Sequence, residues 1–319
     1  MTKLVIQIPC YNEEAALPIT LAALPRELAG VDSIEWLIID DGSSDATIEV
    51  ARRHGVDHVV ALPGHKGLAR AYVAGLEASI RAGADIIVNT DADNQYQADD
   101  IPLLIAPILS GEAEIVVGSR SIDRIENFSR VKKQLQFLGS WVTRKLSGTH
   151  VADAPSGFRA ISREAALRLH VFSDYTYTIE TIIQAGRKGM AITSVPIRTN
   201  PETRDSRLIT SIPHYVQQQL LTMARVFMTY RPFLFFAAPG ALSFAAGFAI
   251  GLRFLFFYLG GTGGGHIQSL ILASLLMGGG AVLVLAGLLA DLIAVNRKLL
   301  EDVDWRVRKV EERLDRPGD

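Results

Sequence analysis

The first 230 residues alternate short apolar runs with amphipathic stretches. Runs rich in β-branched residues predict five strands, over residues 4–9, 35–40, 57–62, 85–90 and 114–118. The stretches between them repeat apolar residues at helical spacing and predict helices over residues 14–24, 44–54, 67–81 and 99–109. Ser44 and Asp99 are the predicted N-caps of the second and fourth helices. This alternation predicts an α/β fold whose parallel sheet is covered by helices on both faces.

Two long apolar spans follow residue 230, at about residues 232–258 and 269–295. Each exceeds the roughly 20 residues that a helix needs to cross a bilayer. A pair of buried core helices is the alternative, and the length of the spans with only one charged residue in each disfavours it. The loop at 260–268 has no Lys or Arg, whereas basic residues flank both spans. The positive-inside rule therefore predicts a multi-pass protein of the inner (plasma) membrane, with its N-terminal domain and both termini cytoplasmic.

Two further segments flank the spans. Residues 209–230 carry apolar side chains at steps of three and four, which predicts an amphipathic helix lying in the membrane surface. A helix packed on the N-terminal domain is the alternative. Residues 297–319 predict a charged cytoplasmic helix whose apolar stripe suits either a short coiled coil or packing on a neighbour. The predicted organisation is thus a domain over 1–208, the interface helix over 209–230, two transmembrane helices within 231–296, and the C-terminal helix.

Composition excludes several classes of protein. The formal net charge of −2 leaves no basic field that would point to nucleic acid. Cys10, the single cysteine, excludes an internal disulfide and is expected to be a buried small hydrophobe. Residues 1–9 are too short for a signal peptide, so the N-terminal domain is expected to fold in the cytosol. The segment from Gly64 to Gly67 lacks P-loop spacing, which disfavours ATP chemistry.

Polar clusters follow the predicted strands, at residues 11–14, 40–45 and 91–95. Parallel sheets bind ligands beyond the carboxyl ends of their strands, so these clusters predict a site there. Asp91 and Asp93 are one residue apart, and in an extended chain both side chains point the same way, with Gln95 next on that side. Such a set suits Mg²⁺ or Mn²⁺, which prefer oxygen ligands and retain water and phosphate oxygens. Asp40 suits a ribose hydroxyl or a base N–H, although a helix cap and turn would also explain its cluster.

Several segments, read together and in order, resemble a known family. They are IPCYNEE, IDDGSSD, TDADNQY, VVGSR, DAPSGFRAISRE and YTIETIIQAGRKGMAITSVPI. From Lys3 to about Leu208 the chain resembles the inverting, GT-A-fold family 2 glycosyltransferases, and among them the dolichyl- and polyprenyl-phosphate sugar synthases. The two-helix C-terminal anchor is similar to bacterial members of that group. The resemblance implies a Rossmann-like GT-A domain with a mostly parallel sheet, followed by the interface helix and the transmembrane hairpin.

The resemblance also implies an activity and its partners. It implies metal-dependent, inverting transfer of a sugar from a UDP- or GDP-linked donor to polyprenyl phosphate at the cytoplasmic membrane face, with Mg²⁺ or Mn²⁺ as cofactor. A homo-oligomer is expected as well, because a lone two-helix hairpin buries little surface in lipid. The implied nucleotide-binding residues are Pro9, Tyr11, Glu13, Asp40, Asp41 and Asp91. The implied metal ligands are Asp91, Asp93 and Gln95.

The remaining implied residues concern the reaction and the acceptor. Asp93, Arg120 and Glu180 correspond to residues near the reaction centre. The implied acceptor-phosphate residues are Ser156, Arg159, Arg204 and Arg207. Arg204 and Arg207 lie in a loop where family members more often have Gly-x-Ser-Lys. This chain has Arg in place of the Lys and lacks the glycine.

The residues themselves favour a phosphate acceptor. A lipid phosphate is ionised at neutral pH and needs cations to position it, and guanidinium groups suit that task. The alternative is a glycolipid synthase that transfers sugar to a lipid hydroxyl, for which Glu180 or Asp153 would serve as general base. No Gln-x-x-Arg-Trp motif of processive polysaccharide synthases is present. A third hypothesis, a non-enzymatic scaffold, is disfavoured by the intact Asp-x-Asp-x-Gln segment.

Overall fold

The computed structural model describes residues 1–120, 139–141, 143–171, 177–201, 217, 221, 224–225, 227–261 and 263–315. The chain divides into two compact units. One comprises Met1–Gln219 with Glu311–Asp319, and the other comprises Leu220–Val310.

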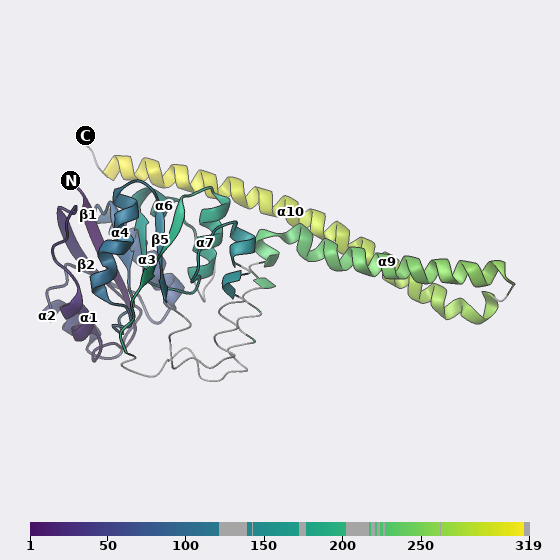
Figure 1. The fold of residues 1–319 in the computed structure, drawn as a ribbon, viewed down its shortest axis with the longest axis horizontal. Helices are drawn as coiled ribbons and strands as arrows, with labels where there is room; N and C mark the ends of the chain where they lie inside the picture. Colours follow the sequence, from purple (N-terminus) through teal and green to yellow (C-terminus); the bar gives the residue numbers. More distant parts are fainter. Residues whose placement is uncertain are drawn as a thin grey trace. The chain divides into compact units, whose positions relative to one another are not determined.

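The first unit is built on a seven-stranded sheet with the order β3-β2-β1-β4-β6-β5-β7. Figure 1 labels β1, β2 and β5 of this sheet. The strands are β1 (Lys3–Cys10), β2 (Ser33–Asp40), β3 (His58–Ala61), β4 (Ile86–Asn89), β5 (Ile115–Arg120), β6 (Arg159–Ser162) and β7 (Ile192–Ile197). All neighbouring pairs are parallel except those of β6, which runs antiparallel to both β4 and β5. The predicted mostly parallel α/β sheet is therefore confirmed. β6 and β7 were not among the five predicted strands, and between Arg159 and Ser162 β6 has only two apolar residues.

The helices of this unit follow the strands along the chain. They are α1 (Leu17–Ala23), α2 (Thr47–Arg53), α3 (Leu68–Arg81), α4 (Ile101–Leu109), α6 (Arg163–Arg168) and α7 (Thr178–Arg187), with a 3-10 turn η1 (Ala98–Asp100) before α4. The four predicted helices are all present, and each begins one to three residues later than predicted. Both predicted N-caps are wrong. Ser44 is bound to Asn12, and Asp99 is an exposed residue of the 3-10 turn.

Two apolar clusters cover the two faces of the sheet. Leu4, Ile6 and Ile8 of β1 point into one cluster, which includes residues of α1 and α4. Val5, between them in sequence, points into the other cluster, which includes residues of α3 and α7. This alternation follows from the two-residue period of a strand, and it leaves the strand ends as the place for polar side chains. Cys10 is 2% exposed, so the prediction of a buried hydrophobe is confirmed.

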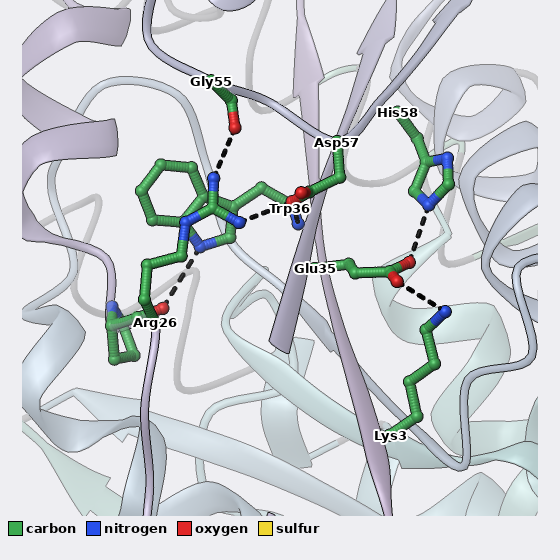
Figure 2. A network of polar contacts seen from close by, with 8 residues as sticks. Lys3, Arg26, Glu35, Trp36, Gly55, Asp57 and His58 are labelled. Carbon is green, nitrogen blue, oxygen red and sulfur yellow. Dashed lines mark hydrogen bonds and ion pairs between the residues drawn. The ribbon is translucent and has the colours of Figure 1, made fainter. Parts of the chain in front are cut away.

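Charged residues tie the amino ends of β1, β2 and β3 together (Figure 2). Glu35 binds Lys3 and His58, each at 2.7 Å. Burial alone would raise the pKa of Glu35, but these two hydrogen bonds outweigh it and lower the pKa. Arg26 stacks on Trp36, with its guanidinium carbon 3.4 Å from the ring centroid, and also binds Asp57. This network lies at the strand ends opposite to the predicted site, and we assign it to stability.

The second unit contains two long apolar helices, α9 (Pro232–Leu259) and α10 (Ile267–Asp315) as far as Val310. By length and composition both can cross a membrane, and only 11% and 17% of their most apolar windows are buried within the structure. Such exposure is not that of soluble core helices. α10 continues without a break beyond residue 296, where the sequence predicted a separate C-terminal helix.

The hairpin of α9 and α10 is packed through small residues. A Cβ added at Gly240 would lie 2.8 Å from the carbonyl oxygen of Gly280, and one at Gly247 would lie 2.8 Å from that of Ala273. These pairs are seven residues apart on each helix, so they form one antiparallel seam. Glycine at such positions lets helix backbones approach closely in lipid. Most of the predicted interface helix, residues 209–230, lies outside the described residues.

Candidate active site

The loops after β1 and β2 are held together by reciprocal hydrogen bonds. The Asn12 N–H donates to the Ser43 hydroxyl at 2.8 Å, and the Ser44 N–H donates to Asn12 Oδ1 at 2.7 Å. The Glu13 N–H donates to the Thr47 hydroxyl at 2.9 Å. Asn12 takes a positive φ of 55°, which asparagine tolerates better than most residues. These hydrogen bonds therefore fix the two polar loops to each other at the carboxyl edge of the sheet.

The neighbouring carboxylates Asp40 and Asp41 have different environments. Asp41 accepts the backbone N–H groups of Lys66 and Gly67 at 2.7 and 2.8 Å, and His65 Nδ1 lies 2.8 Å from it. Its carboxylate is thus occupied in fixing the loop after β3. Asp40 is equally buried, and its Oδ2 accepts the Ser43 N–H at 3.2 Å. Its Oδ1 is enclosed and has no hydrogen-bond partner among the described residues.

An aromatic face lies on the loop after β1. Tyr11 is 39% exposed and stacks on His65, with ring centroids 4.1 Å apart. Pro9 is buried in β1. The pairing of β1 with β4 ends at Gln7, so the lack of an N–H on Pro9 removes no hydrogen bond between these strands. Glu13 is 7% exposed. A partly exposed ring and an unsatisfied carboxylate oxygen are groups that a nucleobase can use, by stacking and by donating an N–H.

The loop that carries Asp91 and Asp93 is held from two sides. The Thr20 hydroxyl of α1 donates to the Ala92 carbonyl at 2.7 Å. Asn200, after β7, donates its N–H to the Gln95 carbonyl at 2.8 Å. β4 ends at Asn89, before the two carboxylates. The expectation that an extended chain aligns them is therefore wrong, because Ala92 and Asp93 form a turn. The Gln95 N–H closes this turn on Asp93 Oδ1 at 3.1 Å.

Asp91 and Asp93 nevertheless interact electrostatically. Desolvation and then the charge of Asp93 raise the pKa of Asp91 to about 7, against the opposing charge of Arg120. The charge of Arg120 opposes this rise without cancelling it, and a divalent cation would neutralise the pair further. Among the described residues no group of three or more His, Cys, Asp or Glu could hold a metal by itself. A metal here would therefore take further oxygens from Gln95, water and a diphosphate, as Mg²⁺ and Mn²⁺ do.

Arg120 lies at the end of β5 in a buried ion pair. Its Nε and one terminal nitrogen donate to Asp153 at 2.7 and 3.1 Å. Burial alone would lower the pKa of Arg120, but Tyr96 and Asp153 outweigh it and raise the pKa, so the guanidinium stays charged. Its charge acts on Asp91. Asp153, held by three hydrogen bonds from Arg120 and 0% exposed, is poorly placed to serve as a general base.

The geometry does not support Arg159 as a phosphate ligand. Its side chain is 1% exposed, and four of its N–H groups are donated within the chain. The acceptors are the carbonyls of Ala154, Ser156 and Thr178 and the hydroxyl of Thr181. Arg159 thus ties the segment before β6 to the first turn of α7. Ser156, by contrast, has a buried hydroxyl without a hydrogen-bond partner among the described residues.

For the other predicted site residues, the structure gives fewer contacts or none. Glu180 is 6% exposed in the first turn of α7, and its role at the reaction centre stays a prediction. Arg204 and Arg207 lie outside the described residues. The sequence reading missed Asn89 and Tyr177, which are buried and hydrogen-bonded to each other at 2.9 Å. Asn89 carried a readable signal, because it is an amide that ends the apolar run of β4.

Comparison with known proteins identifies the family. The sequence model of Glycosyl transferase family 2 matches residues 5–169. The chain belongs to glycosyl transferase family 2. The match runs from β1 to α6 and includes Asp40, Asp41, Asp91, Asp93, Arg120 and the segment before β6. The resemblance read from the sequence motifs is confirmed.

Curated relatives and solved structures agree with the family. The undecaprenyl-phosphate mannosyltransferase of Micrococcus luteus is 30% identical over 200 residues, covering 60% of this chain and 80% of that protein. The UDP-N-acetylglucosamine–dolichyl-phosphate N-acetylglucosaminyltransferase of Methanococcus voltae is 33% identical over 216 residues, covering 60% and 83%. Glucosyl-3-phosphoglycerate synthase of Mycobacterium tuberculosis matches with a TM-score of 0.57 at 22% identity, covering 71% of this chain and 79% of that chain. This structural likeness shows the shared GT-A-like fold.

Proposed function

We propose that this family 2 glycosyltransferase moves a sugar from a UDP- or GDP-linked donor to polyprenyl phosphate, using a divalent metal ion. The observation that carries the proposal is the coupled carboxylate pair Asp91 and Asp93 at the carboxyl edge of the sheet, with the charge of the buried Arg120 acting on Asp91. Transfer from a nucleotide sugar develops negative charge on the leaving diphosphate, and a metal with a guanidinium can stabilise it. Relatives named for undecaprenyl and dolichyl phosphate support the lipid acceptor.

The donor binds on the side of β1 and β2 in this proposal. The exposed ring of Tyr11 offers a stacking face, and Asp40 Oδ1 offers an acceptor for a base N–H. Asp41 contributes indirectly to nucleotide binding, because its carboxylate fixes the loop after β3. Asp91, Asp93 and Gln95 would hold Mg²⁺ or Mn²⁺ beside the diphosphate. The glucosyl-3-phosphoglycerate synthase structures obtained with Mn²⁺ and UDP support a divalent metal.

The acceptor enters from the side of β5 and β6. Its phosphate is ionised, so cations suffice to position it and no strong general base is required. We assign the positioning of the acceptor phosphate to Arg120, to the Ser156 hydroxyl, and to Arg204 and Arg207 of the segment after β7. Arg159 is left out because its N–H groups are used within the chain. A lipid hydroxyl acceptor, the alternative, would need Glu180 as base, since Asp153 is held by Arg120.

The hairpin of α9 and α10 anchors the enzyme in the membrane in this proposal. Its two helices are apolar and exposed over most of their length. With a lipid acceptor, such an anchor keeps the active site at the surface where the phosphate head group lies. We infer that the catalytic domain and both termini face the cytoplasm, from the basic residues that flank the spans. A homo-oligomer through the hairpin is part of the same proposal.

The deciding experiment offers purified full-length protein undecaprenyl phosphate, Mn²⁺ and a panel of radiolabelled UDP- and GDP-sugars. We expect label from one donor to enter the organic phase, and we expect EDTA to abolish the transfer. A diacylglycerol acceptor in a parallel reaction tests the alternative. Transfer to that hydroxyl and none to the lipid phosphate would reject the proposed acceptor. A covalent sugar–enzyme intermediate would reject the inverting, single-displacement chemistry.

Asp40→Asn is expected to weaken nucleotide binding. Oδ2 accepts the Ser43 N–H, so the amide oxygen of the substituted side chain takes that place and its NH₂ stands where Oδ1 was. A donor would then face the base N–H, and the Kd for UDP or GDP should rise about 10- to 30-fold. Isothermal titration calorimetry in Mn²⁺ measures this. Glu49→Gln, which changes an exposed carboxylate on α2, is the matched control and should bind normally. An unchanged Kd in Asp40→Asn would remove Asp40 from the nucleotide site.

A further inference from the structure

Asn89 is a buried amide at the last position of β4, two residues before Asp91. It is 0% exposed and follows Ile86, Ile87 and Val88, where a polar side chain is costly unless its hydrogen bonds are made. It makes three of them. Its Oδ1 accepts from Gln7 Nε2 at 2.9 Å, and its Nδ2 donates to the Gly157 carbonyl at 2.8 Å and to the Tyr177 hydroxyl at 2.9 Å.

These bonds connect segments that are far apart in the sequence. Gln7 belongs to β1, Gly157 precedes β6 on the acceptor side, and Tyr177 precedes α7, which carries Glu180. Gln7 and Asn89 are paired in register on neighbouring strands. Asn89 is therefore a junction between the strand that leads to the carboxylate pair and the two segments assigned to the acceptor.

Gly157 is held at both ends of its peptide. Its carbonyl accepts from Asn89, and its N–H donates to the Tyr96 hydroxyl at 3.1 Å. A Cβ on Gly157 would lie 3.0 Å from Asp91 Oδ1 and 3.1 Å from the Tyr177 hydroxyl. The backbone at Gly157 thus abuts the carboxylate that we assign to the metal, and its position depends on the hydrogen bond from Asn89.

Tyr177 is fixed from a second direction. Its ring stacks on Tyr72 with centroids 3.7 Å apart, and the Arg159 guanidinium carbon lies 5.6 Å from its centroid. Arg159 in turn binds the carbonyls of Ser156 and Thr178. The acceptor-side backbone and the start of α7 are therefore one buried assembly, and Asn89 is its hydrogen-bonded link to β4.

We propose that Asn89 is a positioning residue for the transfer reaction. It sets the placement of the acceptor segment around Gly157, and of the start of α7, relative to Asp91. This inference rests on the proposed function. Asn89 is completely buried and its hydrogen bonds are made within the chain, so it acts through Gly157 and Tyr177 without touching substrate. A shift of less than about 1 Å between the reacting groups is enough to slow a group transfer.

The test uses full-length protein in detergent with three variants. Asn89→Leu removes both donated bonds at similar volume. Gln7→Met is the matched control, because it removes an equally buried amide at the paired register position and leaves both Asn89 donors in place. Tyr177→Phe removes the hydroxyl and keeps the stack on Tyr72. Each variant is assayed for kcat, for KM of donor and acceptor, for Kd of UDP with Mn²⁺, and for amide hydrogen exchange.

Asn89→Leu should lower kcat about 20-fold while the Kd for UDP changes less than about threefold. Exchange should accelerate in residues 154–160, and Gln7→Met should show neither effect. Tyr177→Phe should lower kcat about fivefold, and adding it to Asn89→Leu should cost little more, because the two residues share one bond.

Two outcomes would overturn the inference. One is equal loss of kcat in Asn89→Leu and Gln7→Met, which would indicate a general effect on folding. The other is unchanged exchange over residues 154–160 in Asn89→Leu. Failure of the proposed function is a separate result, since then the wild-type protein moves no label to lipid phosphate. The exchange measurement still decides on Asn89 in that case, because it requires no turnover.

Discussion

Asp93→Asn is expected to lower kcat for sugar transfer by on the order of 10³-fold. The substitution is structurally mild. Asp93 Oδ1 accepts the Gln95 N–H that closes the turn, and an amide oxygen can accept it equally well. The substitution removes the negative charge of Asp93 beside Asp91. It therefore weakens the binding of a metal ion beside the diphosphate. Initial rates with a radiolabelled donor at saturating Mn²⁺ measure the loss.

Asp99→Asn is the matched control for this prediction. Asp99 follows the same loop, is exposed, and lies in the 3-10 turn before α4. Its variant should transfer sugar at the wild-type rate. Nucleotide binding adds a second readout, because UDP should bind Asp93→Asn equally well with and without Mn²⁺. Wild-type kcat in Asp93→Asn, with EDTA still abolishing transfer, would place the metal at other ligands.

Local patterns were sufficient to predict most of the sheet. The apolar runs that gave β1, β2 and β4 are each bounded by polar or glycine-containing segments, and both faces of these strands are buried. β6 was missed because Arg159 stands at its start. That arginine is buried by partners from α7 and the preceding loop, which no local pattern reveals.

The candidate site was predictable by type of residue, while the partners of each residue were not. Asp40 and Asp41 are adjacent and look equivalent in the sequence, yet only Asp41 is occupied by the loop after β3. Arg120 and Arg159 both lie in motifs of the family, yet Arg120 bonds a buried carboxylate whereas Arg159 bonds mostly carbonyls. Which partner a polar group meets depends on packing between distant segments, so such roles require the structure.

Gly157→Ala is expected to lower kcat about 30-fold, since the added Cβ requires a shift of a few tenths of an ångström beside Asp91, and a full 1 Å at a reacting group can cost about 100-fold. The added Cβ would lie 3.0 Å from Asp91 Oδ1 and 3.1 Å from the Tyr177 hydroxyl, so one of the three groups must shift. The φ of Gly157 is outside the left-handed region, and alanine therefore introduces no backbone strain. The effect is steric and acts on the carboxylate that we assign to the metal.

Gly118→Ala separates this effect from crowding in general. A Cβ at Gly118 would be as tight, at 2.9 Å from Ile197 Cδ1 and 3.1 Å from the Phe158 carbonyl oxygen, but no carboxylate is among its nearest atoms. Both variants should lose stability by similar amounts in thermal unfolding, and only Gly157→Ala should lose most of its activity. The Mn²⁺ concentration for half-maximal rate should also rise in Gly157→Ala, because the shifted carboxylate is Asp91. Equal loss of activity in the two variants would mean that crowding beside β6 is the cause, and that the contact of Gly157 with Asp91 has no special part in the reaction.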